Sequence, residues 1–421
     1  MNKRIGNIFK GDKVIWMVFF FLCMISIVEV FSASSGLTYK SHNYVGPIAY
    51  HTTTIIIGVV VAVLTLNIPC RYFKLMTPFL LLITLIMLFI VMLGFGESTN
   101  DASRWIRIGP FTIQPSEIAK GTIILAVAQI LAAMQRENGA DKMAFKWIMW
   151  ITIPFCLAIG MENLSTAALL FAVVFLMMFI GLVPLRQLGK LAAIIFAIGA
   201  FVIIMVLIVG KTDQVEEQQQ LTKTEKLAEK PQEKSAVGGI IDKVLHRADT
   251  WKARILKFGE DDPAPQDYDL DRDAQVAHAN IAIVSSGVVG KGPGQSVERD
   301  FLAQAFSDFI YAIIIEELGI LGASFVAFLY IVLLYRCARI ASRCENNFPA
   351  FLAMGLGMLL VIQATFNMMV AVGLAPVTGQ PLPLISKGGT STIINCAYIG
   401  AILSVSRSAK MKQGQQNKKE I

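Results

Sequence analysis

The sequence predicts an all-α membrane protein that crosses the bilayer about ten times. Of its 421 residues, 55% are hydrophobic and only 16% are charged, and the mean hydropathy is +0.61. Soluble domains carry roughly a quarter charged residues. Apolar runs of roughly 20 residues, long enough to cross a bilayer core, recur along the chain. These runs are continuous rather than alternating, which excludes a β-barrel.

Each apolar run is expected to form one helix. The helices are predicted near residues 14–33, 48–66, 76–94, 116–134, 147–161, 164–182, 191–209, 308–333, 349–371 and 390–406. The first run follows a basic start, as in a signal peptide. Because it is long for a signal peptide and many spans follow, we interpret it as an uncleaved first helix.

The distribution of basic residues predicts the orientation. Loops on the side of the N-terminus hold most of the lysines and arginines outside the longest loop. The opposite short loops hold only Lys40, Arg104, Arg107 and Lys387. By the positive-inside rule, both termini are cytoplasmic. These loops also account for the net charge of +7, so no nucleic-acid partner is predicted.

This topology divides the chain into four parts. Residues 1–210 hold helices one to seven, 211–307 form a large extracytoplasmic loop, 308–408 hold the last three helices, and 409–421 form a cytoplasmic tail. Within the loop, the apolar run 276–289 predicts a short helix at the membrane interface. No internal repeat is visible, which argues against an inverted-repeat transporter.

The most informative position is Asp308, where the long polar stretch ends and an apolar helix begins. A carboxylate at the mouth of a membrane helix suits chemistry on a substrate that is half lipid and half water-soluble. The alternative is a helix cap made by Ser307 or Asp308. Glu316 and Glu317 lie deeper in the span, where acids usually face a cavity or a partner. Because Glu316 is eight residues from Asp308, we expect both on one helix face, with the two glutamates in a supporting role.

A second motif places Arg104, Trp105 and Arg107 shortly before Glu117 and Lys120. We expect the two arginines and Lys120 to form an outward cationic cluster that binds a diphosphate, with Trp105 and Glu117 also at the substrate. Two alternatives remain. Trp105 is equally typical of the interfacial aromatic belt. Glu117 and Lys120, three residues apart, also suit a self-neutralising pair.

A third motif runs from Pro376 to Ser391 and contains three prolines and three glycines between two spans. Irregular backbone at membrane depth must be surrounded by protein or water. We therefore predict a re-entrant-like loop that walls a cavity, with Lys387 as a substrate contact and Ser386 in a supporting role.

No metal-ligand set or cofactor motif is predicted. The histidines and cysteines lack ligand spacing. Asp267, Asp269, Asp271 and Asp273 alternate like the start of a calcium loop, but Arg272 stands where that loop needs glycine. A divalent cation, Mg²⁺ or Mn²⁺, is left as an open alternative.

Together and in this order, the three motifs resemble the SEDS family of cell-wall polymerases, the FtsW and RodA proteins. The specific blocks are residues 104–120, 308–319 and 367–391, and the likeness covers about residues 14 to 408. The resemblance implies ten membrane helices in the bacterial inner membrane, with a large extracytoplasmic loop between the seventh and eighth. It also implies polymerisation of lipid II into peptidoglycan strands, with a class B penicillin-binding protein as partner. General likeness favours FtsW, and hence division, over RodA and elongation.

The resemblance also implies roles for particular residues. The family's essential aspartate matches Asp308, its functional tryptophan matches Trp105, and its Ser-Glu-x-x-Lys segment matches the stretch from Ser116 to Lys120. There are departures. Many relatives have a histidine at position 306, where this chain has phenylalanine, and a tyrosine at position 387. An aspartate that follows the fifth helix in relatives is missing, and Glu162 is the acid that would substitute for it.

The predicted mechanism has Asp308 as general base for an acceptor-sugar hydroxyl, which attacks the anomeric carbon and expels a lipid diphosphate with inversion. Two other classes fit the same features. A flippase for lipid-linked precursors would use the cavity and charges without chemistry, and a scaffold would only recruit a transpeptidase.

Overall fold

The computed structural model describes residues 10–34, 46–93, 97–99, 102–108, 111–137, 139–209, 274–302 and 305–417. The chain forms two compact units. One comprises residues 1–185 and 269–421, and the other comprises residues 186–268. Helix α9 (Leu185–Val209) lies almost wholly in the second unit and is a single apolar helix. All other elements below belong to the first unit.

Long helices occupy all ten predicted places in the described residues. Besides α9, they are α2 (Lys13–Ala33), α4 (Gly46–Asn67), α5 (Cys70–Met92), α6 (Pro115–Ala133), α7 (Lys142–Glu162), α8 (Leu164–Ile180), α13 (Ile310–Ala341), α14 (Asn347–Ala371) and α15 (Thr390–Asn417). Seven described helices are long and apolar enough to cross a membrane: α2, α4, α5, α6, α7, α13 and α14. The predicted all-α, multi-pass class is confirmed.

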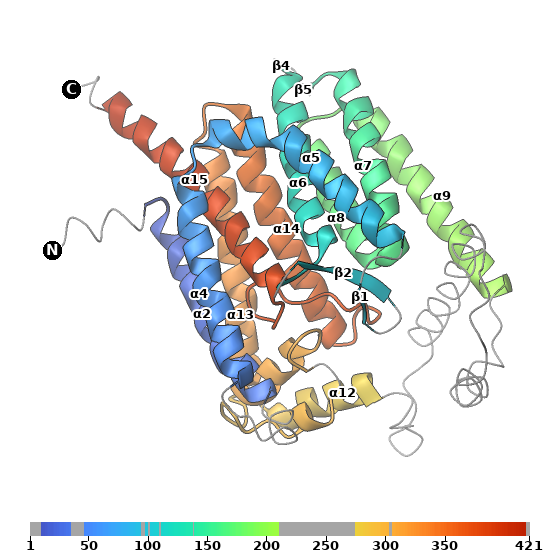
Figure 1. The fold of residues 1–421 in the computed structure, drawn as a ribbon, viewed down its shortest axis with the longest axis vertical. Coiled ribbons are helices and arrows are strands. Elements are labelled where there is room, and N and C mark those ends of the chain that lie inside the picture. The colour runs from blue at the N-terminus through green and yellow to red at the C-terminus, as the bar shows by residue number, and fades with distance from the viewer. Residues whose placement is uncertain are drawn as a thin grey trace. The chain divides into compact units, whose positions relative to one another are not determined.

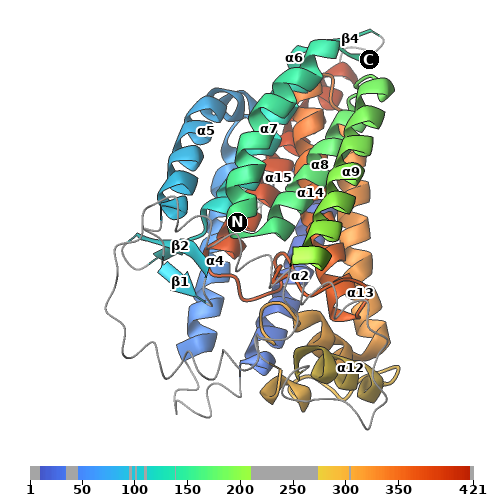
Figure 2. The same ribbon diagram turned by 90° about the vertical axis from the view of Figure 1, so that its right-hand side faces the viewer.

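Helix α14 is central to the first unit and packs against α6, α8, α13 and α15, while α2 lies against α13 and α15 lies against α4 (Figure 1). Glycines on α14 permit this close approach, because a Cβ at Gly355 would lie 2.7 Å from the sulfur of Met177 on α8. A short helix, α12 (Ala274–Ser286), lies at one end of the bundle against α13 (Figure 2). Its position in the chain confirms the helix predicted at 276–289.

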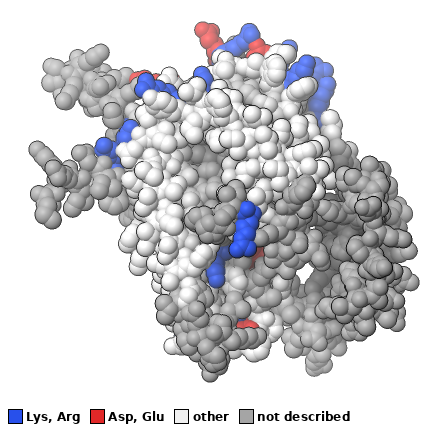
Figure 3. All heavy atoms as spheres, viewed as in Figure 1, with Lys and Arg blue, Asp and Glu red and all other residues white. Residues whose placement is uncertain are grey.

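The outer surface of the bundle is apolar. On α5, for example, Phe79, Leu82 and Phe89 are each more than half exposed. Figure 3 shows broad uncharged areas on one face, with lysines and arginines near its upper edge and in one group near its centre. Contiguous apolar surface of this extent requires lipid rather than water around it.

Short strands precede α6, which the sequence did not lead us to expect. Strands β1 (Glu97–Thr99), β2 (Ala102–Ile108) and β3 (Phe111–Ile113) form an antiparallel sheet in that order. A second, two-stranded sheet joins β4 (Gln135–Arg136) and β5 (Gly139–Ala140). Thr390 Oγ1, at the start of α15, donates to Thr112 O of β3 at 2.7 Å. The sheet is thereby attached beside the loop that precedes α15.

That loop, residues 372–389, turns back into the protein as predicted for the third motif. Leu382, Leu384 and Ile385 are buried. Tyr330 on α13 donates to Pro383 O, and Ser26 Oγ on α2 donates to Ile385 O at 2.6 Å. Leu384 has a φ of +69°, a conformation that costs a non-glycine residue roughly 1–3 kcal/mol. The surrounding helices therefore hold a strained backbone conformation at Leu384 within the loop.

An ion pair joins the start of α2 to α13. Asp12 caps α2 by accepting from Val14 N and Ile15 N, and Arg336 of α13 pairs with it. Burial raises the pKa of the Asp12 carboxyl, but the Arg336 guanidinium and these amides lower it by more, so its pKa lies below the usual value for aspartate.

We expect Asp12→Asn to keep the helix cap but to destabilise the protein by about 1–3 kcal/mol at neutral pH, because it removes a charged hydrogen bond. A carboxyl with a depressed pKa contributes stability above its unfolded pKa and loses it as the pH falls through the folded value. The deficit in melting temperature of the detergent-solubilised variant should therefore stay constant from neutral pH to pH 5. It should shrink only below about pH 4. A deficit that disappeared near pH 6 would contradict this assignment.

Candidate active site

The candidate site centres on the residues that immediately precede α13 and on the loop between α14 and α15. Three consecutive backbone carbonyls of the pre-helical segment each accept a hydrogen bond. The donors are Lys387 N to Phe306 O at 2.9 Å, Ser386 Oγ to Ser307 O at 2.6 Å and Asn367 Nδ2 to Asp308 O at 2.8 Å. The backbone that carries Asp308 is thus fixed by groups distant in sequence.

The Asp308 carboxylate is partly exposed and lies against the loop. Ser307 Oγ donates to Asp308 Oδ1 at 3.0 Å. A Cβ built at Gly379 would lie 3.3 Å from Asp308 Oδ2, and Gly379 has a φ of +69°. Both the space and the backbone conformation therefore favour glycine where the loop closes on the carboxylate.

Two expectations about Asp308 are wrong. The residue that caps α13 is Phe309, and it makes no side-chain cap bond. Neither Ser307 nor Asp308 caps the helix. Because Asp308 precedes the helix, it also does not share a helical face with Glu316.

Glu316 and Glu317 instead hold the segment that follows α12. Both side chains are fully buried. Glu316 accepts from Lys291 Nζ at 2.6 Å and Val297 N at 3.0 Å, and Glu317 accepts from Gly294 N at 2.9 Å and Ser296 N at 3.2 Å. These glutamates were expected to support the Asp308 face. Their carboxylates serve as acceptors for the 291–298 segment.

The chain that follows α12 also fills a break in α13. Gly319 has φ +70° and ψ −175°, so the helical hydrogen-bond ladder is interrupted there. Residues 287–292 fill the gap. Lys291 N donates to Glu316 O at 2.9 Å and Gly292 N donates to Glu317 O at 2.8 Å. Ile320 N donates back to Gly287 O at 3.4 Å. The segment after α12 thereby satisfies backbone groups that the break would leave unpaired.

We expect Gly319→Ala to release this segment. The conformation of Gly319 is essentially restricted to glycine, and its Cβ would lie 2.3 Å from Val288 O. Strain of roughly 1–3 kcal/mol, together with the lost contacts, should raise hydrogen exchange and protease cleavage in residues 287–298. The control is Gly189→Ala, since a Cβ there meets nothing within 4 Å. Equal protection in the two variants would contradict the docking role.

Lys120 does not belong to an outward cationic cluster, and that expectation is wrong. Its side chain is fully buried, and its Nζ lies 2.8 Å from Glu117 Oε1 and 2.8 Å from Gln363 Oε1. Gln363 Nε2 in turn donates to Pro381 O of the loop at 3.1 Å. The alternative of a self-neutralising pair is what the structure contains. The pair links α6 to α14 and, through Gln363, to the loop beside Asp308.

Two other cations of the predicted site, Lys387 and Arg107, lie on different elements. Lys387 is partly exposed and its Nζ lies 4.9 Å from the centre of the Phe306 ring, next to the Asp308 segment. Burial lowers the pKa of the Lys387 ammonium. On β2, Trp105 is partly exposed and Arg107 is exposed. The side chain of Arg104 lies outside the described residues. The structure thus brings Lys387, and not Lys120, to the Asp308 segment.

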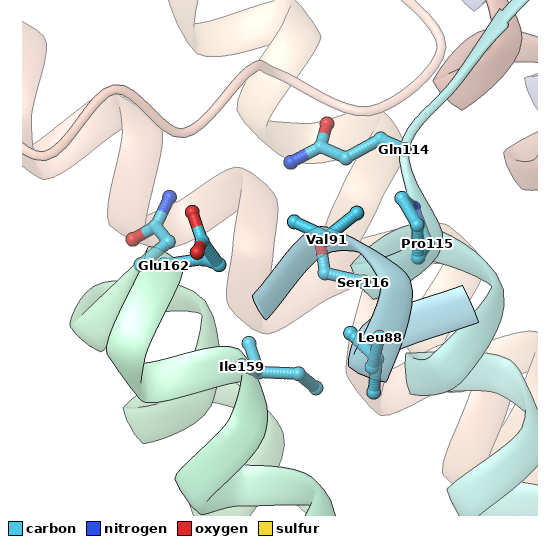
Figure 4. A pocket seen from close by; sticks show the side chains of 8 residues that line it. Leu88, Val91, Gln114, Pro115, Ser116, Ile159 and Glu162 are labelled. Carbon is cyan, nitrogen blue, oxygen red and sulfur yellow. The ribbon is translucent and has the colours of Figure 1, made fainter. Parts of the chain in front are cut away.

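A small pocket lies between the ends of α5 and α7 and the start of α6. Gln114 and Glu162 approach this space from opposite sides (Figure 4). Ser116 and Asn163 also line it. Thr166, one turn after Asn163, accepts from Gln380 Nε2 at 2.7 Å. The pocket wall is therefore connected to the loop that surrounds Asp308.

Among the described residues, no group of three or more His, Cys, Asp or Glu side chains could hold a metal ion. The alternating aspartates at 267–273 lie outside the described residues.

The sequence matches the family described as "Cell cycle protein" (FtsW, RodA, SpoVE) over residues 12–411. The chain belongs to this family. The SEDS resemblance drawn from three motifs is therefore confirmed.

Relatives of this SEDS protein align over nearly its whole length. It is 28% identical to a probable peptidoglycan glycosyltransferase FtsW from Trichlorobacter lovleyi, with 95% of this chain and 94% of the relative covered. It is 26% identical to peptidoglycan glycosyltransferase MrdB from Escherichia coli K12, with the same coverage. The fold resembles a chain in a solved peptidoglycan synthase complex that coordinates polymerization and crosslinking. The TM-score is 0.66 and the identity 22%, with 94% of this chain and 98% of the other covered.

Three polar residues of this SEDS protein's site were not predicted individually: Gln363, Asn367 and Gln380. All three are nearly inaccessible, with exposed fractions of 4% or less. One signal was available in the sequence. Gln363 and Asn367 are amides four residues apart in an apolar helix, so they share a face, and buried amides in a span need partners.

Proposed function

We propose that this protein is a peptidoglycan glycosyltransferase that polymerises lipid II into glycan strands. The observation that carries the proposal is the partly exposed carboxylate of Asp308, fixed at the start of a membrane helix, in a chain of this family. The names of relatives aligned over most of the chain support the same activity.

In the proposed mechanism, Asp308 accepts the proton of the acceptor-sugar hydroxyl as general base. The oxygen attacks the anomeric carbon of the growing strand, the bond to the lipid diphosphate breaks, and the anomer is inverted. General-base help is worth about 10²–10⁴-fold, so charge stabilisation of the leaving diphosphate is also needed. Lys387 and Arg107 are the described candidates for that role, with Arg104 or a divalent cation (Mg²⁺ or Mn²⁺) as further ones. Trp105 is proposed to contact the substrate from β2.

The proposed setting is the bacterial inner membrane, with both termini in the cytoplasm and the 211–307 loop outside. The excess of basic residues on the side of the termini supports this orientation. The proposed partner is a class B penicillin-binding protein, supported by the likeness to a chain from a complex that couples polymerization to crosslinking. General sequence likeness favours the FtsW role in division over the RodA role in elongation.

The test is incubation of the purified protein, with and without its transpeptidase partner, with lipid-linked disaccharide in detergent micelles. We expect glycan polymer, resolved by length on a gel. Micelles have no compartments, so a flippase would produce no polymer, and a scaffold would produce none in the absence of another polymerase. Absence of product from the complex, under conditions in which an active polymerase of the same family forms polymer, would contradict the proposal.

A further inference from the structure

Asn367 joins the two sides of the candidate site through a single nitrogen. Its Nδ2 donates to Asp308 O at 2.8 Å and to Gln380 O at 2.7 Å, and its exposed fraction is 1%. An amide nitrogen has two N–H groups, and both are used here. This geometry also fixes the amide orientation, because the carbonyl oxygen of the side chain could not face two other carbonyl oxygens.

The two acceptors belong to the two parts that enclose the carboxylate. One is the backbone carbonyl of Asp308 itself. The other is the carbonyl of Gln380, and the residue before it, Gly379, lies close to Asp308 Oδ2. Asn367 therefore sets the distance between the carboxylate and the facing loop.

We propose that Asn367 is a positioning residue, which holds Asp308 at the distance and angle needed to accept the proton of the acceptor hydroxyl. The inference rests on the proposed function. It assigns Asn367 no contact with substrate.

Other groups hold the loop and the segment without Asn367. Gln363 Nε2 binds Pro381 O at 3.1 Å, and Ser386 Oγ binds Ser307 O at 2.6 Å. Loss of the Asn367 amide should therefore shift Asp308 locally rather than detach the loop. A displacement of about 1 Å at a reacting group costs up to about 10²-fold in rate.

The decisive variant is Asn367→Leu, which has similar volume and no donor. We expect kcat for polymerisation to fall between about 10- and 100-fold, with KM for lipid-linked disaccharide within about twofold of wild type. Asn395→Leu is the matched control, because it makes the same change at a buried site on α15 and should keep near-normal activity. An unchanged kcat in Asn367→Leu, or an equal loss in the control, would overturn the inference.

A second variant, Asn367→Asp, is nearly isosteric and keeps the inference testable if the leucine variant does not fold. An ionised carboxylate would face two carbonyl oxygens, whereas a protonated one can donate to one of them. The ratio of variant to wild-type kcat should therefore rise as the pH falls. The charged groups on the elements packed against this position are Asp308, Lys387 and the Glu117–Lys120 pair. The two proteins are therefore compared over the pH range in which wild-type kcat is constant, so that the titration of these groups in wild type does not enter the ratio.

A kcat ratio of about one at every pH would show that the Asn367 amide is not needed to position Asp308 and would overturn the inference. The outcome for the proposed function is read separately, from the wild-type protein. If wild type forms polymer and the Asn367 variants do so equally well, only the positioning role fails. If wild type forms none, the proposed function fails and this inference with it.

Discussion

Replacing Asp308 by asparagine should leave a folded protein that polymerises lipid-linked disaccharide at least about 10²-fold, and up to about 10⁴-fold, more slowly than wild type. Asparagine preserves the backbone carbonyl bound by Asn367, and its side-chain oxygen can still accept from Ser307 Oγ. It cannot accept the proton of a sugar hydroxyl. The measurement is the initial rate of polymer formation by purified protein with its partner, together with the melting temperature.

Asp300→Asn is the matched control for this prediction. This variant makes the same acid-to-amide change in the 274–302 segment, at a side chain that is 52% exposed. We expect its rate to equal that of wild type. A normal polymerisation rate in Asp308→Asn would remove Asp308 as the general base. A large loss of melting temperature in that variant would instead indicate that the carboxylate is needed for folding.

Much of the fold could be predicted from apolar run length alone. A span must satisfy its backbone internally, so helices are the only solution for continuous apolar runs, and helices occupy all ten predicted places. The first residues of the helices were less predictable. Asp308 was placed inside a helix because apolar sequence follows it at once, yet α13 begins at Ile310. Three long-range hydrogen bonds to the 306–308 carbonyls compete with the helix there.

The site was predicted in part, and the failures share a physical cause. Spacing along a helix tells which residues share a face, but not what that face meets. Glu117 and Lys120 were correctly expected to be neighbours, but the sequence left open whether the pair faced outward. Glu316 and Glu317 were recognised as costly acids in a span. Their partners, backbone amides of residues 294–297, lie about 20 residues earlier in the chain, and no local pattern indicates such a contact.

Replacing Lys120 by methionine should sharply destabilise the protein. The substitution leaves the Glu117 carboxylate buried without its cation, and breaking a buried ion pair in this way costs about 3–5 kcal/mol. We expect a lower yield of folded protein and a clearly lower melting temperature in detergent. Lys146→Met, at an exposed position on α7, makes the same chemical change and should leave both quantities near wild type.

The double variant Glu117→Gln with Lys120→Met separates stability from catalysis. It removes both charges, and such replacements of a whole buried pair are often neutral or stabilising, so the melting temperature should recover. If the pair only joins α6 to α14 and the loop, polymerisation should recover with it to within about tenfold, since Gln363 can still bind Pro381 O. A stable double variant with no activity would contradict the structural role. It would instead require that the charge of Lys120 or Glu117 acts in the reaction despite its burial.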